Sequence, residues 1–323
     1  MTPTELIEGN VAMVFPGQGS QFVGMGTELQ SVSPAARAIF AEADALLSVP
    51  LSSFIAEGPA DVLEDTINAQ PAILTASVAA LAAVRERLEV KSDTITPLVV
   101  AGHSMGEFTA LVAAGALDFP SALTLVRERG RLMKEAGIES PGGMAAVLGL
   151  DDETLAAACA EASSIGIVVI ANANCPGQIV ISGEVAALER AMQLAKERGA
   201  KRVTRLGISI ASHSPLMANA SRQFAEVVRD TDIKVPTIPV IANVTAQPLR
   251  TAAEIRTELS YQIERPVNWT GSVRTMVDHH VDTVVELGPG AVLSGLIKRI
   301  TIDVRTLTIA DLGLDLPGLG KPA

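Results

Sequence analysis

The amino-acid sequence predicts an α/β protein in which a large domain with a parallel-sheet core is interrupted by a small domain. Three observations favour this fold class: apolar strands that end in glycine-rich loops, helical patterns between those strands, and a separate βαββαβ order in mid-chain. The composition agrees, because 48% of the 323 residues are hydrophobic but only 3% are aromatic. Such a profile, rich in Ala, Val, Leu and Ile, suits a sheet buried by helices.

The large domain is indicated by short apolar runs at 11–15 and 98–101, which end in Pro16-Gly17-Gln18-Gly19 and in Gly102. Each run reads as a buried strand that enters a tight turn. Strands separated by helices pair in parallel, so these elements predict a layered α/β core. The helices are expected at 33–47, 71–88 and 119–136, and further strands near 239–242 and 283–286.

The small domain is indicated after Ser140-Pro141-Gly142-Gly143, where the order of elements changes. Its βαββαβ order is the ferredoxin-like signature. The expected strands are 144–148, 168–171, 178–182 and 202–206, and the expected helices are 152–161 and 184–198. We therefore divide the chain into a large catalytic domain (1–138 and 208–311), an inserted subdomain (139–207) and a loosely ordered tail (312–323).

Charge and cysteine content exclude several classes of protein. Thirty-six acidic residues against 25 basic ones give a net charge of −11, which argues against nonspecific binding to nucleic acid. Cys159 and Cys175 have no metal-ligand spacing, so both are expected to be reduced, with no metal site. The start of the chain shows no secretory signal, and the apolar stretch at 71–84 is too short to span a bilayer, so a cytoplasmic protein without a membrane segment is expected.

A nucleophile elbow is the strongest chemical signal. Gly102-His103-Ser104-Met105-Gly106 follows an apolar strand and opens a helix, which is the context that G-x-S-x-G requires in an α/β-hydrolase-like domain. Small residues flank Ser104 because the strained turn leaves no room for side chains. The helix N-terminus behind the serine offers free N–H groups to an oxyanion.

Four histidines could supply the base that Ser104 needs. His103 lies inside the elbow, where packing or hydrogen bonding near the site is more compatible with its geometry than proton abstraction. His279 and His280 close a helix, where a cation complements the helix dipole. His213 lies where the chain returns from the small domain to the large one, so we predict that it is the catalytic base at the cleft between them.

Four motifs in order carry a family resemblance. Together they resemble the malonyl-CoA:acyl carrier protein transacylase family over nearly the whole chain, and four ordered motifs are far more specific than one. The motifs are Phe15-Pro16-Gly17-Gln18-Gly19-Ser20-Gln21, Gly102-His103-Ser104-Met105-Gly106-Glu107, Ser212-His213-Ser214-Pro215-Leu216-Met217 and Glu286-Leu287-Gly288-Pro289-Gly290.

The resemblance implies a transferase that needs no cofactor and moves a malonyl group from malonyl-CoA to the phosphopantetheine arm of an acyl carrier protein by ping-pong chemistry. It implies Ser104 as nucleophile and His213 as base, oriented by backbone carbonyls. The backbone amides of Gln18 and Met105 would form the oxyanion hole, and a monomer is compatible with this scheme.

The same resemblance implies that Arg129 grips the malonyl carboxylate in a pocket lined by Gln262, with His103 nearby. Physical chemistry supports the arginine independently, because a planar guanidinium can pair bidentately with a carboxylate that must lose its water.

Three alternatives stay open. The Ala211-Ser212-His213 context is similar to that of polyketide acyltransferases that accept methylmalonyl, so the donor and the pathway are undetermined. A serine esterase or thioesterase would share the elbow but needs an acid and a histidine late in the chain, for which Asp278 with His279 or His280 is an awkward choice. A non-catalytic scaffold has no reason to keep Ser104 and His213.

Carrier docking needs a local basic surface, because the chain as a whole is acidic. Positive charge concentrates at the end of the predicted small domain, close in sequence to His213. The residues concerned are Lys196, Arg198, Lys201, Arg202 and Arg205.

Overall fold

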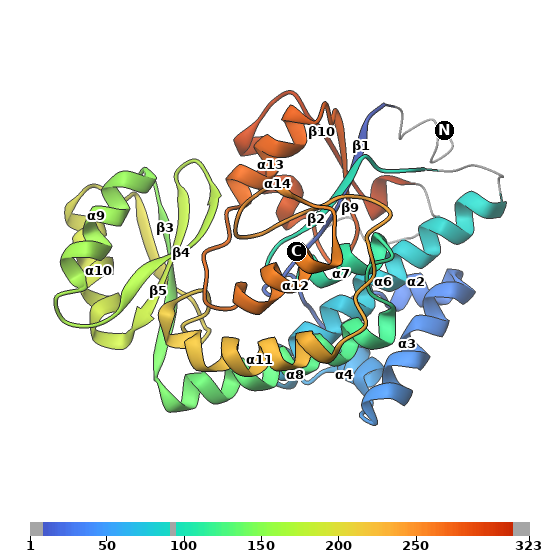
Figure 1. Ribbon diagram of the computed structural model, residues 1–323, viewed down its shortest axis with the longest axis horizontal. Helices are drawn as coiled ribbons and strands as arrows, with labels where there is room; N and C mark the ends of the chain where they lie inside the picture. Colours follow the sequence, from blue (N-terminus) through green and yellow to red (C-terminus); the bar gives the residue numbers. More distant parts are fainter. Residues whose placement is uncertain (1–8, 91–94, 313–323) are drawn as a thin grey trace.

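The computed structural model describes residues 9–90 and 95–312, and it contains two β-sheets with helices around them (Figure 1). The larger sheet has the order β10-β9-β1-β2-β7-β8. Its strands are β1 (Val11–Phe15), β2 (Val99–Gly102), β7 (Val240–Ile241), β8 (Pro248–Leu249), β9 (Thr283–Glu286) and β10 (Arg305–Thr308). All neighbours from β10 to β7 are parallel, and only the short edge strand β8 is antiparallel. The predicted parallel α/β core is therefore confirmed.

Strand β1 lies in the middle of the large sheet and is buried along its whole length. Its alternate side chains enter two different hydrophobic clusters, because successive residues of a strand point to opposite faces. Met13 and Phe15 pack in the larger cluster, whereas Ala12 and Val14 pack with Trp269 on the other face. Helices cover both faces of the sheet, which explains why the strand is apolar at every position rather than at every second one.

The helices of the large domain fall into two groups along the chain. Before the inserted segment they are α2 (Thr27–Val32), α3 (Pro34–Leu47), α4 (Leu51–Glu57), α5 (Ala60–Glu64), α6 (Thr66–Val90), α7 (Gly106–Ala113) and α8 (Phe119–Glu139). After it they are η1 (Pro215–Met217), α11 (Ala218–Asp230), α12 (Ala252–Tyr261), α13 (Trp269–Asp278), α14 (Val292–Ile300) and η2 (Ile309–Leu312).

Helix α6 begins five residues earlier than the sequence predicts, and Pro71 lies inside it. Proline has no N–H to donate to the carbonyl four residues earlier. That carbonyl, on Ile67, instead accepts a hydrogen bond of 2.7 Å from Arg127 Nη1 on α8. By length and composition, residues Thr66–Leu88 could cross a membrane, but 83% of the apolar 18-residue window within this stretch is buried inside the protein, as expected for a core helix.

The smaller sheet lies to one side of the molecule and is antiparallel, with the order β4-β5-β3-β6 (Figure 1). If β3 to β6 are numbered 1 to 4, the order read from β6 to β4 is 4-1-3-2, which is that of a ferredoxin-like sheet. The predicted subdomain type is therefore confirmed. Its elements are β3 (Gly142–Leu148), α9 (Asp152–Ala162), β4 (Val168–Cys175), β5 (Gln178–Glu184), α10 (Val185–Glu197) and β6 (Arg202–Arg205). Asp151 caps α9 by accepting a hydrogen bond from the Thr154 N–H.

Edge strand β4 joins the small sheet to the large domain. The Ala173 N–H donates to the Val267 carbonyl, and the Val267 N–H donates to the Ala171 carbonyl, at 2.9 and 2.8 Å. The segment before α13 therefore acts as an extra strand on this edge. The exact division at residues 138, 207 and 311 stays a prediction, and the predicted tail lies outside the described residues except for Leu312.

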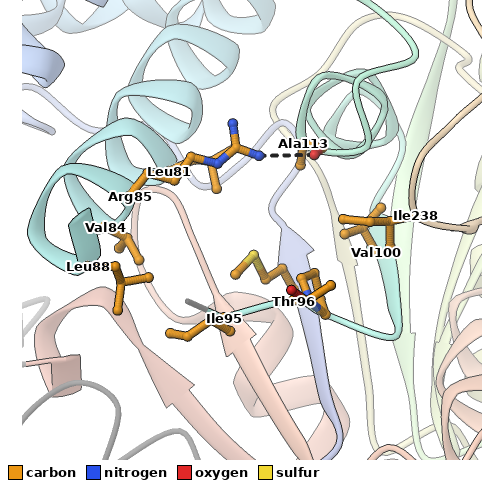
Figure 2. Close-up of a pocket in the computed structure, with 11 residues that line it drawn as sticks. Leu81, Val84, Arg85, Leu88, Ile95, Thr96, Val100, Ala113 and Ile238 are labelled. Atoms are coloured by element: carbon orange, nitrogen blue, oxygen red, sulfur yellow. Dashed lines mark hydrogen bonds between the residues drawn. The ribbon is translucent and has the colours of Figure 1, made fainter. Parts of the chain in front are cut away.

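An apolar cavity of about 120 Å³ lies between α6 and the large sheet (Figure 2). Arg85 Nη2 donates to the Ala113 carbonyl at 3.1 Å beside it, and Ile95 and Thr96, which precede β2, form another wall. These residues lie toward the amino end of β2. The catalytic motifs predicted from the sequence follow the carboxyl ends of the strands, so this cavity is separate from them.

Candidate active site

Several loops of the candidate site leave the same edge of the large sheet. The loop with Gln18 follows β1, Ser104 follows β2 and Asn243 follows β7. Parallel strands place their carboxyl ends together, and this edge is where open α/β sheets bind ligands. Segments far apart in the sequence therefore meet beside Ser104.

The elbow has the geometry that its glycines imply. Ser104 adopts a left-handed conformation with φ of +51°, which is strained for a residue with a side chain. A Cβ on Gly102 would lie 2.0 Å from Gly106, and a Cβ on Gly106 would lie 2.2 Å from the Phe15 carbonyl oxygen. Glycine is thus required at both positions: at Gly102 because the turn folds back on itself, and at Gly106 because the elbow packs directly against the end of β1.

Ser104 and His213 form the predicted pair. Ser104 Oγ lies 2.8 Å from His213 Nε2. On the other side of the ring, His213 Nδ1 lies 3.0 Å from the Gln262 carbonyl and 2.9 Å from the Arg265 carbonyl. A carbonyl can only accept, so Nδ1 carries the proton and Nε2 keeps a lone pair toward the serine. Backbone carbonyls, not an acidic side chain, hold this histidine.

His213 is a neutral base at physiological pH. Burial lowers its pKa to about 3, and the positive charge of Arg129 adds to the effect. The two backbone carbonyls act in the opposite direction but do not overcome burial. A buried imidazole without a proton on Nε2 is ready to accept one from Ser104.

Arg129 is a buried cation beside Ser104. Its side chain is on α8 and is 1% exposed. The guanidinium donates to three uncharged partners: Gln70 Oε1 at 2.8 Å, Gln262 Oε1 at 2.9 Å and Ser104 Oγ at 3.1 Å. Burial lowers its pKa to about 10, and the charge of Glu107 opposes this. Arg129 therefore stays protonated and, among the residues that the structure describes, bonds no carboxylate directly, so a bound anion would compensate its charge.

Gln18 and Met105 supply two backbone N–H groups near the serine. A Cβ on Gly17 would lie 2.4 Å from the His103 carbonyl oxygen, so the two loops are in close contact. Within residues 9–90 and 95–312, neither the Gln18 nor the Met105 amide donates to a protein acceptor. Both are thus free for a ligand oxygen, although the Gln18 side chain is engaged with Thr66 Oγ1 at 2.9 Å.

A groove of about 460 Å³ gives access to this loop. Gln18 and Thr66 line one side, and the chain that returns from the small domain lines the other through Ile208 and Ile210. The residues that line this groove belong almost entirely to the large domain, so the predicted cleft between the two domains at His213 stays a prediction.

His103 precedes Ser104 in the elbow, but its ring bonds a different partner. Its Nε2 is 2.8 Å from Asn174 Oδ1 on β4, and its ring lies 5.7 Å from that of Trp269. Burial lowers its pKa, so the ring is neutral and links the elbow to the small sheet. Its contact with substrate stays a prediction.

His279 and His280 do not belong to this site. They follow α13 and precede β9, so they lie at the amino end of that strand. Ser104 follows the carboxyl end of β2, and the sheet is parallel here. This separation disfavours the esterase alternative in which Asp278 and a neighbouring histidine complete a triad.

Sequence reasoning missed four polar residues that surround the elbow. Gln70, Asn174 and Asn243 are at least nine-tenths buried, and Glu107 is fully buried. A polar residue directly after a buried strand was the available signal for Asn243, and Glu107 stands next to the elbow motif itself. Within the described part of the chain, no cluster of three or more His, Cys, Asp or Glu side chains could hold a metal ion.

A serine on an elbow, paired with a neutral histidine above a parallel sheet, is the arrangement of enzymes that form acyl esters on serine. Residues 12–311 match the acyl transferase domain family. The malonyl CoA-acyl carrier protein transacylase of Bacillus subtilis is 46% identical over 302 residues, which cover 93% of each chain. The Escherichia coli K12 protein of the same name is 44% identical over 301 residues, covering 93% of this chain and 95% of that one.

Solved structures agree with the sequence relatives. An acyl carrier protein S-malonyltransferase from Vibrio cholerae has a TM-score of 0.87 at 40% identity, covering 93% of this chain and 96% of that one. A malonyl-transacylase solved in complex with its type II PKS acyl-carrier protein has a TM-score of 0.90 at 40% identity, with coverage of 96% and 99%. The chain belongs to the malonyl CoA-acyl carrier protein transacylase family. It is an acyltransferase, and its relatives support a soluble protein.

Proposed function

We propose that this enzyme transfers a malonyl group from malonyl-CoA to the phosphopantetheine thiol of an acyl carrier protein, through a malonyl ester on Ser104. The observation that carries the proposal is the position of Arg129, a buried cation with uncharged partners 3.1 Å from the nucleophilic oxygen. A donor that ends in a carboxylate supplies the missing negative charge at that place. The names of the relatives and of the complex with a carrier protein support the same reaction.

The first half-reaction begins with a proton transfer. His213 Nε2 accepts the proton of Ser104 Oγ, and the oxygen attacks the thioester carbonyl of malonyl-CoA. The carbonyl oxygen becomes an oxyanion, which the Gln18 and Met105 amides stabilise. The carbon–sulfur bond then breaks, CoA leaves as a thiol with the proton from His213, and the malonyl ester remains on Ser104.

The second half-reaction runs the same steps toward the carrier. His213 takes the proton of the phosphopantetheine thiol, and the sulfur attacks the ester carbonyl. The collapse of the tetrahedral intermediate breaks the bond to Ser104 Oγ, which recovers its proton from His213. Because the base is neutral before each half-reaction, the same residue serves both.

Arg129 and Gln262 form the proposed carboxylate pocket. Gln262 Oε1 accepts from both Arg129 Nε and Nη2, at 3.2 and 2.9 Å, and thereby fixes the plane of the guanidinium. A malonyl carboxylate can bind this oriented cation with little further loss of side-chain freedom. Acetyl has no carboxylate and leaves the charge uncompensated.

The carrier requires a basic surface, which we place across one end of the small sheet. Gln178, Leu148 and Arg202 are neighbours in register on β5, β3 and β6. Arg299 on α14 donates to the Gln178 side chain, so it lies at the same end of this sheet. Lys201, Arg202, Lys298 and Arg299 are all exposed there, and we call them the basic strip. Arg198 and Arg205 of the predicted patch instead pair with Glu161 and Glu189.

The test of the proposed function is the mass of the intact protein after exposure to malonyl-CoA. We expect a gain of one malonyl group in the unmodified enzyme and in Ser164→Ala, which alters an exposed serine in a turn. Ser104→Ala should gain nothing. An adduct that survives Ser104→Ala would reject the assignment of the nucleophile.

The same measurement with methylmalonyl-CoA and acetyl-CoA tests donor choice. Ala211, the residue that suggests methylmalonyl, is fully buried. It packs so closely on Gly142 that a Cβ added to this glycine would lie 2.8 Å from the Ala211 Cβ. We propose malonyl as the donor. We also propose a cytoplasmic location, because free cysteines such as Cys159 and Cys175 stay reduced in that compartment.

A further inference from the structure

The backbone of Ser104 is held by side chains from outside the elbow. Asn243, directly after β7, accepts the Ser104 N–H on Oδ1 at 2.7 Å and donates from Nδ2 to the Gly102 carbonyl at 2.8 Å. One carboxamide thus bonds the residues on either side of His103. Asn243 is 2% exposed, so these bonds do not compete with bulk water.

The hydrogen bonds from Asn243 stabilise the strained backbone conformation of Ser104. A residue with a side chain pays a free-energy cost for a left-handed conformation, and it stays there only when its surroundings over-determine it. Ser104 has φ of +51°, and both of its backbone polar groups form hydrogen bonds with side chains. The N–H donates to Asn243 Oδ1, and the carbonyl accepts from Gln262 Nε2 at 3.0 Å.

The buried acid Glu107 forms hydrogen bonds with both Asn243 and Gln262. Glu107 Oε1 accepts the Asn243 backbone N–H at 3.0 Å, and its Oε2 bonds Gln262 Nε2. Burial raises the pKa of Glu107 well above its usual range, and the nearby Glu258 adds to this. Glu258 itself accepts the Val244 N–H at 2.8 Å, so both carboxyl groups hold the turn that carries Asn243.

We propose that Asn243 is a positioning residue of the transfer reaction: it holds the backbone of Ser104 so that Oγ faces His213 and the Met105 amide faces the oxyanion. The inference rests on the proposed function, because it assigns a task within the serine chemistry. By bonding the Ser104 N–H, Asn243 also leaves the next amide, that of Met105, as the free donor of the elbow. Asn243 touches no reacting atom.

The first test is Asn243→Ala, measured as the rate constant of Ser104 acylation in single-turnover experiments with malonyl-CoA. We expect a fall of about 100-fold, because displacement of a reacting group by 1 Å can cost that much. The dissociation constant for malonyl-CoA, measured in a Ser104→Ala background to prevent reaction, should change less than about twofold. A merely structural role would weaken binding and acylation together.

A second variant keeps the test decisive if Asn243→Ala fails to fold. Asn243→Asp retains an acceptor for the Ser104 N–H but directs a carboxylate oxygen at the Gly102 carbonyl. When the new carboxyl group is protonated it can donate to that carbonyl again. The ratio of variant to unmodified acylation rates should therefore rise as the pH falls. Taking the ratio removes the part of the pH dependence of Glu107, Glu258 and His213 that both proteins share.

Asn10→Asp is the matched control. Asn10 Nδ2 also donates to a backbone carbonyl, that of His280, at 2.9 Å, but at the amino end of β1. We expect no pH-dependent ratio for this variant. Near-normal acylation in Asn243→Asp with a ratio independent of pH would overturn the inference. If the unmodified enzyme itself forms no ester on Ser104, it is the proposed function that fails.

Discussion

Replacing Arg129 by alanine should change which acyl donor the enzyme prefers. Arg129→Ala removes the cation that contacts Ser104 Oγ, together with the hydrogen bonds to Gln70 and Gln262. Loss of the Ser104 contact slows both malonyl and acetyl transfer. Loss of the charge affects malonyl alone, because only this donor has a carboxylate to place there.

The size of the expected fall in this preference follows from the burial of the ion pair between Arg129 and the malonyl carboxylate. Truncating one partner of a buried, hydrogen-bonded ion pair costs about 2–5 kcal/mol, and Arg129 is 1% exposed. A cost of about 3 kcal/mol corresponds to roughly 150-fold in kcat/KM, since each 1.36 kcal/mol is a factor of ten. We therefore expect the ratio of malonyl to acetyl kcat/KM to fall by about two orders of magnitude.

The assay measures kcat/KM for both donors with one carrier protein, so that effects common to both cancel in the ratio. Arg131→Ala is the control, because this neighbouring arginine is half-exposed and pairs with Glu128 and Glu135 on the same helix. Its ratio should stay at the value of the unmodified enzyme. An unchanged ratio in Arg129→Ala would refute the carboxylate role, even if both rates fall.

Two further predictions concern the base and the carrier. Because the pKa of His213 is lowered to about 3, acylation should not decline between pH 7 and pH 5, where a histidine with the ordinary value of about 6.5 would lose about 25-fold. Removing the Arg129 charge raises the pKa of His213, so Arg129→Gln should shift the acidic limb of the single-turnover profile to higher pH, and a shift to lower pH would contradict the electrostatic account. Arg202→Glu combined with Arg299→Glu should raise the carrier KM by about tenfold at low salt and less at high salt, with serine acylation unchanged. The control Arg222→Glu on α11 should leave the carrier KM as it is, and equal kinetics in both variants would reject the basic strip as the docking surface.

The sequence was most informative where one local rule decides the outcome. Apolar runs before glycine loops located β1 and β2, and the elbow motif located Ser104, because its glycines are forced by contacts below 2.5 Å. The order of strands and helices identified the ferredoxin-like sheet. In each of these cases the physical constraint lies within a few neighbouring residues.

The parts that escaped prediction depend on contacts between distant segments. The start of α6 was missed because Pro71 reads as a helix start, and only Arg127 on another helix compensates the lost bond to Ile67. Asn243 was missed because its task appears only when β7 lies beside β2. The family resemblance pointed to Arg129, but only tertiary packing shows that its side chain is buried.

The central place of β1 has a consequence for how the chain acquires its fold during synthesis. This first strand pairs with β2 on one side and with β9, which lies about 270 residues later, on the other. Until β9 leaves the ribosome, the backbone N–H and C=O groups along one edge of β1 lack their partners, and such edges invite association with other chains. Truncated or stalled chains that end before residue 283 should therefore depend strongly on chaperones, whereas a chain that includes β9 can complete the sheet.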